Sequence, residues 1–127
     1  MIRLARPEVE IIACEPEGAA LLSGKPWAPH KIQGWTPDFV PEVLKRDVAH
    51  RIVTVGDAEA VESARALARS EGILCGISSG ATFAAALKVA AAATQGAVIL
   101  AMLPDTGERY LSTVLFEGIA DAGDPEP

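Results

Sequence analysis

The feature that most constrains the fold of this chain is an alanine-rich stretch, residues 80–93, that is apolar on nearly every side. Only Thr82 and Lys88 interrupt it. A helix that is hydrophobic all round is a buried helix, so it needs packing layers around it. The apolar run before it breaks at residues 76–81 (Gly-Ile-Ser-Ser-Gly-Ala), which places serine hydroxyls and free backbone N–H groups at a helix N-terminus. Such a terminus suits an anion or an electron-rich ring nitrogen.

Alternating apolar and amphipathic runs flank this helix. The apolar runs predict strands and the amphipathic runs predict helices. Because strands alternate with helices, we expect an α/β fold with a mostly parallel sheet and right-handed crossovers. Ligands bind such sheets at the carboxyl ends of the strands. The expected strands are residues 9–14, 51–55 and 97–103, and the other expected helices run from Asp57 as a cap to Gly72 and from about Glu108 to Ala120.

The N-terminal end of the chain is unusual for a doubly wound domain. Residues 1–5 resemble the end of an amphipathic helix that has no cap before it. Three strands are also few for a sheet that covers a fully buried helix. At 127 residues the chain has the size of one domain. We therefore expect a partial three-layer, doubly wound α/β domain over residues 1–120, incomplete at its N-terminus, followed by an acidic tail over residues 121–127.

Composition excludes several classes of function. The net charge is −6, with 17 acidic and 11 basic residues, and nucleic-acid binding calls for a clustered basic face. No apolar run reaches the roughly 18 residues of a membrane helix, and no signal peptide precedes the first strand. We therefore expect a cytoplasmic location. Cys14 and Cys75 have no metal-ligand spacing to each other or to His30 and His50, which favours two buried reduced thiols.

Ser78 allows three interpretations from local sequence. The pattern of glycine, serine and glycine at positions 76, 78 and 80 fits the nucleophile elbow of hydrolases. In that fold the catalytic histidine follows the serine, whereas His50 is the last histidine here. A second interpretation is that Ser78 and Ser79 cap the following helix. A third is that the Ser78 hydroxyl binds a ligand and needs no general base.

Three segments together resemble a known family. They are residues 29–34 (Pro-His-Lys-Ile-Gln-Gly), 72–81 (Gly-Ile-Leu-Cys-Gly-Ile-Ser-Ser-Gly-Ala) and 103–113 (Leu-Pro-Asp-Thr-Gly-Glu-Arg-Tyr-Leu-Ser-Thr). In order and spacing they resemble the C-terminal part of cysteine synthase (O-acetylserine sulfhydrylase), within the cysteine synthase and cystathionine β-synthase group of pyridoxal-phosphate enzymes. The resemblance extends over residues 1–116 and implies the tryptophan synthase β-like fold, fold type II.

The resemblance also implies a reaction and a set of site residues. The family replaces the acetate of O-acetylserine with sulfide at the β-carbon, which yields L-cysteine. By analogy Ser78 faces the pyridine nitrogen of pyridoxal 5'-phosphate, and Pro104 and Asp105 lie near the same edge of the ring. Gln33 and Gly34 would lie on the loop that closes over the substrate. The complete enzyme is expected to be a homodimer, with serine acetyltransferase as a possible partner.

Parts of the family pattern are absent from this chain. None of its lysines lies in the family's Schiff-base segment, so no catalytic residue is expected here. The glycine-rich phosphate loop and the asparagine-containing substrate loop are also absent. We therefore predict that the isolated chain is inactive and binds the cofactor weakly or not at all. The alternative is a non-catalytic module that complements an N-terminal half or binds serine acetyltransferase. The lysines are Lys25, Lys31, Lys45 and Lys88.

Overall fold

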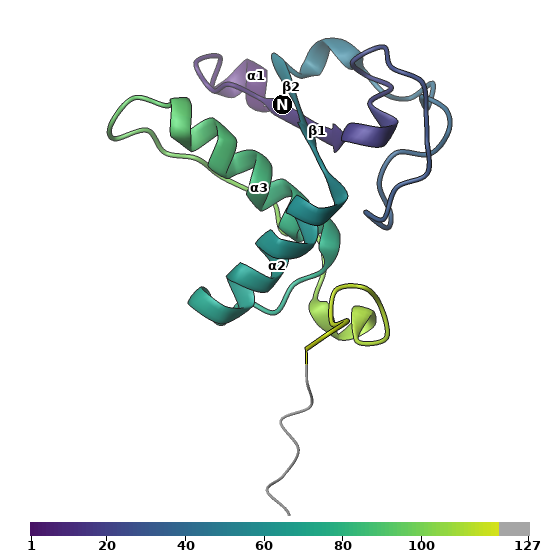
Figure 1. Cartoon of the computed structure of the whole chain (residues 1–127). Helices are drawn as coiled ribbons and strands as arrows, with labels where there is room; N and C mark the ends of the chain where they lie inside the picture. The colour runs from purple at the N-terminus through teal and green to yellow at the C-terminus, as the bar shows by residue number, and fades with distance from the viewer. Residues whose placement is uncertain (120–127) are drawn as a thin grey trace, which may run out of the picture.

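The computed structural model describes residues 1–119 of the chain (Figure 1). Two strands, three α-helices and three 3₁₀ turns make up its regular structure within this range. The elements in chain order are α1 (Ile2–Ala5), β1 (Ile12–Pro16), η1 (Glu17–Ala19), η2 (Arg46–Val48), β2 (Arg51–Val55), α2 (Asp57–Glu71), α3 (Ile77–Ala92) and η3 (Gly107–Tyr110).

The strands β1 and β2 pair in parallel, with Ile12 opposite Arg51 and Pro16 opposite Val55. The second predicted strand is therefore confirmed at its predicted bounds. The first lies further along the chain than the predicted residues 9–14, and it includes Glu15, which lies beyond the predicted end of the strand. The carboxylate of Glu15 is buried and accepts the N–H groups of Leu22 at 2.8 Å and Ser23 at 3.0 Å. Because those bonds satisfy the charge, the strand can continue through it.

Helix α2 follows β2 directly and ends where its sequence predicted. Gly72 takes a left-handed conformation, with φ of 68°, and closes the helix as its C-cap. The predicted cap at the other end is wrong, because Gly56 and not Asp57 is the N-cap. The Asp57 carboxylate instead accepts the backbone N–H of Lys31 at 2.9 Å. That bond ties the long loop between the strands to the start of α2.

Helices α2 and α3 pack against each other, and α3 also contacts the sheet. Gly80 allows the close approach, because a Cβ there would lie 2.7 Å from the Ala64 nitrogen and closer still to the Ala60 carbonyl oxygen. The prediction of a buried helix holds for only the first half of α3. Its second half, including Leu87, is largely exposed in the described part of the chain.

The predicted strand at residues 97–103 is wrong. This segment runs back alongside α3 in extended form (Figure 1), where Thr82 Oγ1 donates to the carbonyl of Met102. Val98 and Leu100 are 97% and 95% exposed. A strand needs a neighbouring strand for its backbone hydrogen bonds, and none of residues 1–119 pairs with this segment.

The predicted helix from Glu108 to Ala120 is also wrong in its described part. The chain forms η3 and then a series of turns. The Arg65 guanidinium accounts for part of the difference, since it donates to the carbonyls of Val114 at 3.0 Å and of Leu115 and Glu117 at 2.7 Å. Those carbonyls would otherwise accept bonds within a helix. Ala120 and the predicted acidic tail at 121–127 lie outside the described residues.

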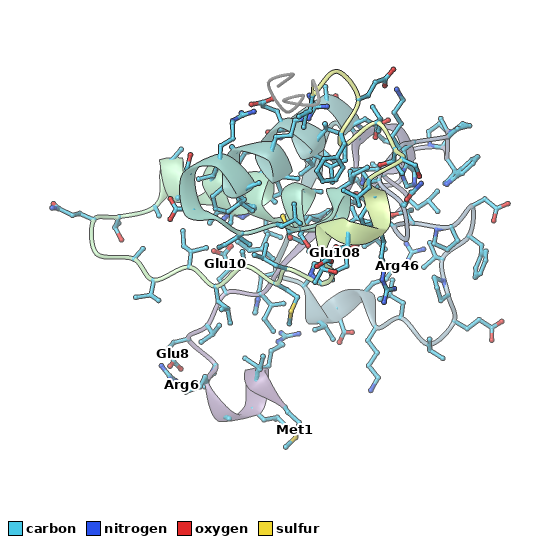
Figure 2. The ribbon with its side chains drawn as sticks, turned by 90° about the horizontal axis from the view of Figure 1, so that it is seen from below. Met1, Arg6, Glu8, Glu10, Arg46 and Glu108 are labelled. Atoms are coloured by element: carbon cyan, nitrogen blue, oxygen red, sulfur yellow. The ribbon has the colours of Figure 1, made fainter. Side chains whose placement is uncertain are left out.

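The N-terminal segment projects from the rest of the molecule. Helix α1 is short and fully exposed, as Figure 2 shows for Met1 at its end. Arg6 and Glu8 form an exposed ion pair just after it. Among residues 1–119, no helix has the length and apolar character of a membrane-spanning segment.

Candidate functional site

The candidate site is built where α3 begins. Gly76 is the N-cap of this helix, and its backbone N–H donates to the carbonyl of Asp105 at 3.4 Å. Cys75 and Thr106 form an antiparallel bridge beside it, and the N–H of Gly107 donates to the carbonyl of Leu74 at 3.1 Å. This pairing brings the segment before α3 and the segment before η3 together, although they lie far apart in the sequence.

The carboxylate of Asp105 accepts hydrogen bonds from three hydroxyl groups. Ser78 Oγ donates to Oδ1 at 3.1 Å and Ser79 Oγ donates to the same oxygen at 2.9 Å. The Tyr110 hydroxyl donates to Oδ2. Ser79 Oγ also lies 3.2 Å from the Asp105 carbonyl oxygen. We call Ser78, Ser79, Asp105 and Tyr110 the Asp105 cluster.

The cluster bears on two of the three interpretations of the serines, helix capping and the hydrolase nucleophile. Ser78 and Ser79 lie inside the first turn of α3, and no side chain caps the helix. The helix-capping interpretation is therefore wrong. Ser78 is 6% exposed, and its hydroxyl bonds a carboxylate, not an imidazole. The rings of His30 and His50 bond backbone groups of Thr36 and Ile11 instead, so the geometry lends no support to a hydrolase.

Only glycine fits at position 76, because side chains of the Asp105 cluster lie close to its Cα. A Cβ at Gly76 would collide with the Asp105 carboxylate and the ring of Tyr110. At Gly107 a Cβ would lie 2.7 Å from the Leu74 side chain. Small residues on both segments thus allow the carboxylate to reach the first turn of α3.

Asp105 sets the protonation of its neighbours. Its hydrogen bond to the Tyr110 hydroxyl, together with burial, raises the pKa of that phenol. Burial and then the negative charge of Asp105 raise the pKa of the Cys75 thiol. Burial alone raises the pKa of Cys14. The phenol and both thiols therefore stay protonated near neutral pH, so neither cysteine is an activated nucleophile. Both are free thiols, as the sequence predicted, although Cys14 is only partly buried.

Comparison with known proteins gives the family. The family model of the pyridoxal-phosphate dependent enzymes matches residues 1–105. The chain belongs to this family. It is 54% identical to the O-ureido-L-serine synthase of Streptomyces lavendulae over 98% of its own length and 38% of that protein. It is 44% identical to a cysteine synthase of Staphylococcus aureus over 87% of its length and 36% of that protein.

Solved structures agree with this assignment. The crystal structure of O-ureido-L-serine synthase superposes with a TM-score of 0.92 at 54% identity, over 98% of this chain and 39% of that one. The cysteine synthase of Entamoeba histolytica gives a TM-score of 0.87 at 39% identity, over 97% and 36%. The chain thus has part of the fold type II architecture, as predicted. It spans less than two-fifths of the length of these relatives.

Members of this family bind pyridoxal phosphate, the cofactor that the sequence predicted. The residues of this chain can therefore be tested for their fit to that cofactor. The hydroxyl of Ser78 is a neutral, buried donor, which fits an unprotonated pyridine nitrogen as acceptor. The described residues fit that end of the ring only. Lys88 is engaged elsewhere, since its Nζ donates to the Thr54 carbonyl at 2.9 Å and to Glu59 at 2.7 Å. Two hollows of about 580 and 190 Å³ lie along α2, and neither is lined by Ser78 or Asp105.

The other predicted site residues lie apart from the cluster. Pro104 is exposed next to Asp105. Gln33 and Gly34 are exposed on the long loop, and no hydrogen bond within residues 1–119 joins them to the cluster. The structure therefore brings Ser78 and Asp105 together but leaves the substrate-loop residues separate from them.

Two residues of the cluster were missed by the sequence reasoning. Ser79 was read only as a cap, although its side chain is fully buried. Tyr110 lies within the segment 103–113 that resembles the family, but no role was predicted for it. The signal for Ser79 was its place in the first turn of a buried helix. The signal for Tyr110 was its position as the only tyrosine of the chain, five residues after the aspartate.

Proposed function

We propose that this chain is the C-terminal portion of a cysteine synthase-type enzyme that replaces a leaving group at the β-carbon of an O-activated serine. The observation that supports this most directly is the buried Ser78 hydroxyl in the first turn of α3, held beside Asp105. Family membership and relatives at 54% and 44% identity support the same reaction class.

The proposed role of Ser78 is to donate its hydroxyl hydrogen to the cofactor's ring nitrogen. A neutral donor leaves that nitrogen unprotonated and moderates the ring. When bound, pyridoxal phosphate supplies an electron sink for the bonds at the substrate's α-carbon, which permits loss of a β-leaving group. The Ser78 hydroxyl bonds Asp105 in this structure, so it must rotate to reach a ring. Ser79 and Tyr110 keep Asp105 in place during that change.

The other predicted residues complete the proposed site. Pro104 and Asp105 would lie along the nitrogen edge of the ring. Gln33 and Gly34, on an exposed loop, would close over the substrate. A glycine lets the backbone come close to a ligand. In the complete enzyme we expect a homodimer, and its active site could accept the tail of serine acetyltransferase.

The lone chain should be inactive on energetic grounds. One hydrogen bond from Ser78 contributes a net ~0.5–1.5 kcal/mol, whereas micromolar affinity needs about 8 kcal/mol. The helix N-terminus that anchors the cofactor's phosphate and the Schiff-base lysine belong, in our proposal, to the N-terminal part of the complete enzyme. A colourless purified chain is expected.

The nucleophile has two candidates. Sulfide would yield L-cysteine, with a new C–S bond and departure of acetate. The relative at 54% identity favours a second candidate, the synthesis of O-ureido-L-serine. There the oxygen of hydroxyurea would form the new bond to the β-carbon, and acetate again departs.

The proposed function is tested by complementation. The chain is mixed with an N-terminal segment of a cysteine synthase relative, and product is measured with O-acetylserine and either sulfide or hydroxyurea. We expect product from the mixture and none from either part. Binding of the two parts without turnover would instead favour the non-catalytic module.

Two neighbouring serines provide a matched pair of variants for this assay. Ser78→Ala should weaken cofactor affinity about two- to tenfold, the loss of one hydrogen bond. Ser79→Ala should leave cofactor affinity near wild type and lower the free energy of unfolding by ~1–3 kcal/mol, because it strips a buried partner from Asp105. Equal cofactor affinity in Ser78→Ala and wild type contradicts the role given to Ser78.

A further inference from the structure

The long loop contains one backbone position that its residue type does not favour. Thr36 has φ of 33°, and it is the only residue other than glycine with positive φ among residues 1–119. A β-branched residue rarely adopts this conformation, which is strained. Two residues earlier Gly34 also has a positive φ, of 82°. The strained Thr36 is therefore separated from the exposed Gln33 and Gly34 by Trp35 alone.

Two aromatic ring nitrogens converge on the carbonyl oxygen of Thr36. Trp27 Nε1 donates to it at 3.1 Å, and His30 Nε2 lies 3.3 Å from it. A carbonyl oxygen only accepts, so His30 must carry its hydrogen on Nε2. The other ring nitrogen, Nδ1, is buried and has no hydrogen-bond partner among residues 1–119. The imidazole is therefore placed to donate through one specified nitrogen.

The rest of the turn is anchored on both sides. Ile32 is fully buried in the core, and the N–H of Trp35 donates to its carbonyl at 3.2 Å. The N–H of Lys31 bonds the carboxylate of Asp57 at the start of α2. Only Gln33 and Gly34, between these anchors, are left exposed. Thr36 directly follows Trp35, the residue whose N–H closes this turn, so the backbone of Thr36 continues from the closing hydrogen bond.

We propose that His30 is a positioning residue for this turn, acting with Trp27 through the carbonyl of Thr36. The two ring N–H groups hold the strained Thr36 backbone and so fix the direction in which Gln33 and Gly34 face the substrate. This inference rests on the proposed function for the identity of the substrate, an O-activated serine. The clamp itself, defined as Trp27, His30 and Thr36, is a property of this chain.

The clamp is tested first in the full chain without any activity. Trp27 and Trp35 are its only tryptophans, so fluorescence reports on this loop alone. His30→Leu should change the tryptophan emission spectrum and the quenching of that emission. His30→Gln, whose amide can still donate a hydrogen bond, should return both to the wild-type values. The same change at the other histidine, His50→Leu, is the control. Nitrogen NMR should find His30 as the Nε2–H tautomer. Equal spectra for His30→Leu and wild type, or an Nδ1–H tautomer, overturn the proposal.

A second variant separates positioning from general folding. Thr36→Gly removes the strain, since glycine adopts positive φ freely. In that background His30→Leu should have a much smaller effect on fluorescence than it has alone. If the effect of His30→Leu is the same in both backgrounds, the strained carbonyl is not what His30 holds.

Kinetics of the complemented enzyme give the functional readout. His30→Leu should raise KM for O-acetylserine about two- to tenfold, in line with one lost hydrogen bond, and leave cofactor absorbance unchanged. His30→Gln should return KM towards wild type. If His30→Leu changes the tryptophan fluorescence but leaves KM for O-acetylserine unchanged, the positioning role is overturned. Failure of the proposed function would show differently, as an inactive wild-type mixture with the fluorescence results intact.

Discussion

Asp105 is the residue on which the local chemistry depends. Its carboxylate accepts hydrogen bonds from hydroxyl groups in the first turn of α3 and from the Tyr110 hydroxyl. Its backbone carbonyl accepts a hydrogen bond from the N–H of Gly76. Asp105 is partly buried, and these donors compensate the carboxylate for the water that it loses. If the Ser78 hydroxyl turned to another acceptor, as we propose, Asp105 would keep the hydrogen bonds from Ser79 and Tyr110.

The single tyrosine reports directly on this arrangement. The pKa of Tyr110 is raised above its usual value of 10.0, first by its hydrogen bond to Asp105. Asp105→Asn removes the carboxylate, so phenolate absorbance should appear at lower pH than in wild type. A group whose pKa rises on folding adds stability below its unfolded pKa and loses it as pH passes the folded value. Wild type should therefore lose this contribution to the free energy of unfolding only in strongly alkaline solution. The Asp105→Asn variant should lose it at a lower pH. Identical alkaline titrations of the two proteins contradict the hydrogen bond.

The two cysteines allow a test of the charge on Asp105. Burial raises the pKa of both thiols, but only Cys75 also faces Asp105. Alkylation follows the thiolate fraction, so both should react slowly in the folded chain. Asp105→Asn should speed the alkylation of Cys75 relative to Cys14, measured by mass spectrometry of labelled peptides. A constant ratio of the two rates would show that the charge does not act on Cys75.

At the scale of elements, the sequence predicted what depends on local pattern. The strand at residues 51–55 and the glycine end of α2 were predicted correctly, because an apolar run and a left-handed glycine act within a few residues. The strand at 97–103 and the helix after Glu108 were not. Their outcome depends on distant groups: a neighbouring strand for the first, and the Arg65 guanidinium for the second.

The contact between α2 and α3 gives a prediction at this scale. In Gly80→Ala the new Cβ would press on the Ala60 carbonyl and the Ala64 backbone. Overpacking costs ~1–3 kcal/mol, while alanine gains roughly 1 kcal/mol in helix propensity. The rigid backbone cannot yield without separating the helices, so a net loss of unfolding free energy is expected in urea denaturation. Gly18→Ala is the control, because its Cβ meets only the Pro29 oxygen at 3.8 Å. A Gly80→Ala chain as stable as this control would contradict the packing.

At the scale of the whole molecule, the candidate site could be predicted only in part. Ser78 and Asp105 were named as cofactor-site residues from the resemblance of their segments to the family, and that role stays a prediction. Their contact was not predicted, since it depends on the bridge between Cys75 and Thr106. Ser79 and Tyr110 were missed because their importance arises only once that bridge places them around one carboxylate.

The exposed apolar segment predicts how the lone chain behaves. Val98 and Leu100 are almost fully exposed, and their extended backbone offers unpaired groups to another strand. The chain alone should self-associate, and replacing both residues with threonine should reduce this in sedimentation experiments. The same variant should bind an N-terminal segment more weakly. A monodisperse wild-type monomer that melts cooperatively would contradict the expectation.

The central claim is that this chain supplies one wall of a pyridoxal-phosphate site whose reactive amine lies in another segment. The most direct test is the visible spectrum and cysteine production of the chain with cofactor, O-acetylserine and sulfide, before and after an N-terminal segment is added. We predict no lysine-bound cofactor absorbance and no product before the addition, and both after it. Turnover by the 127-residue chain alone would contradict the account.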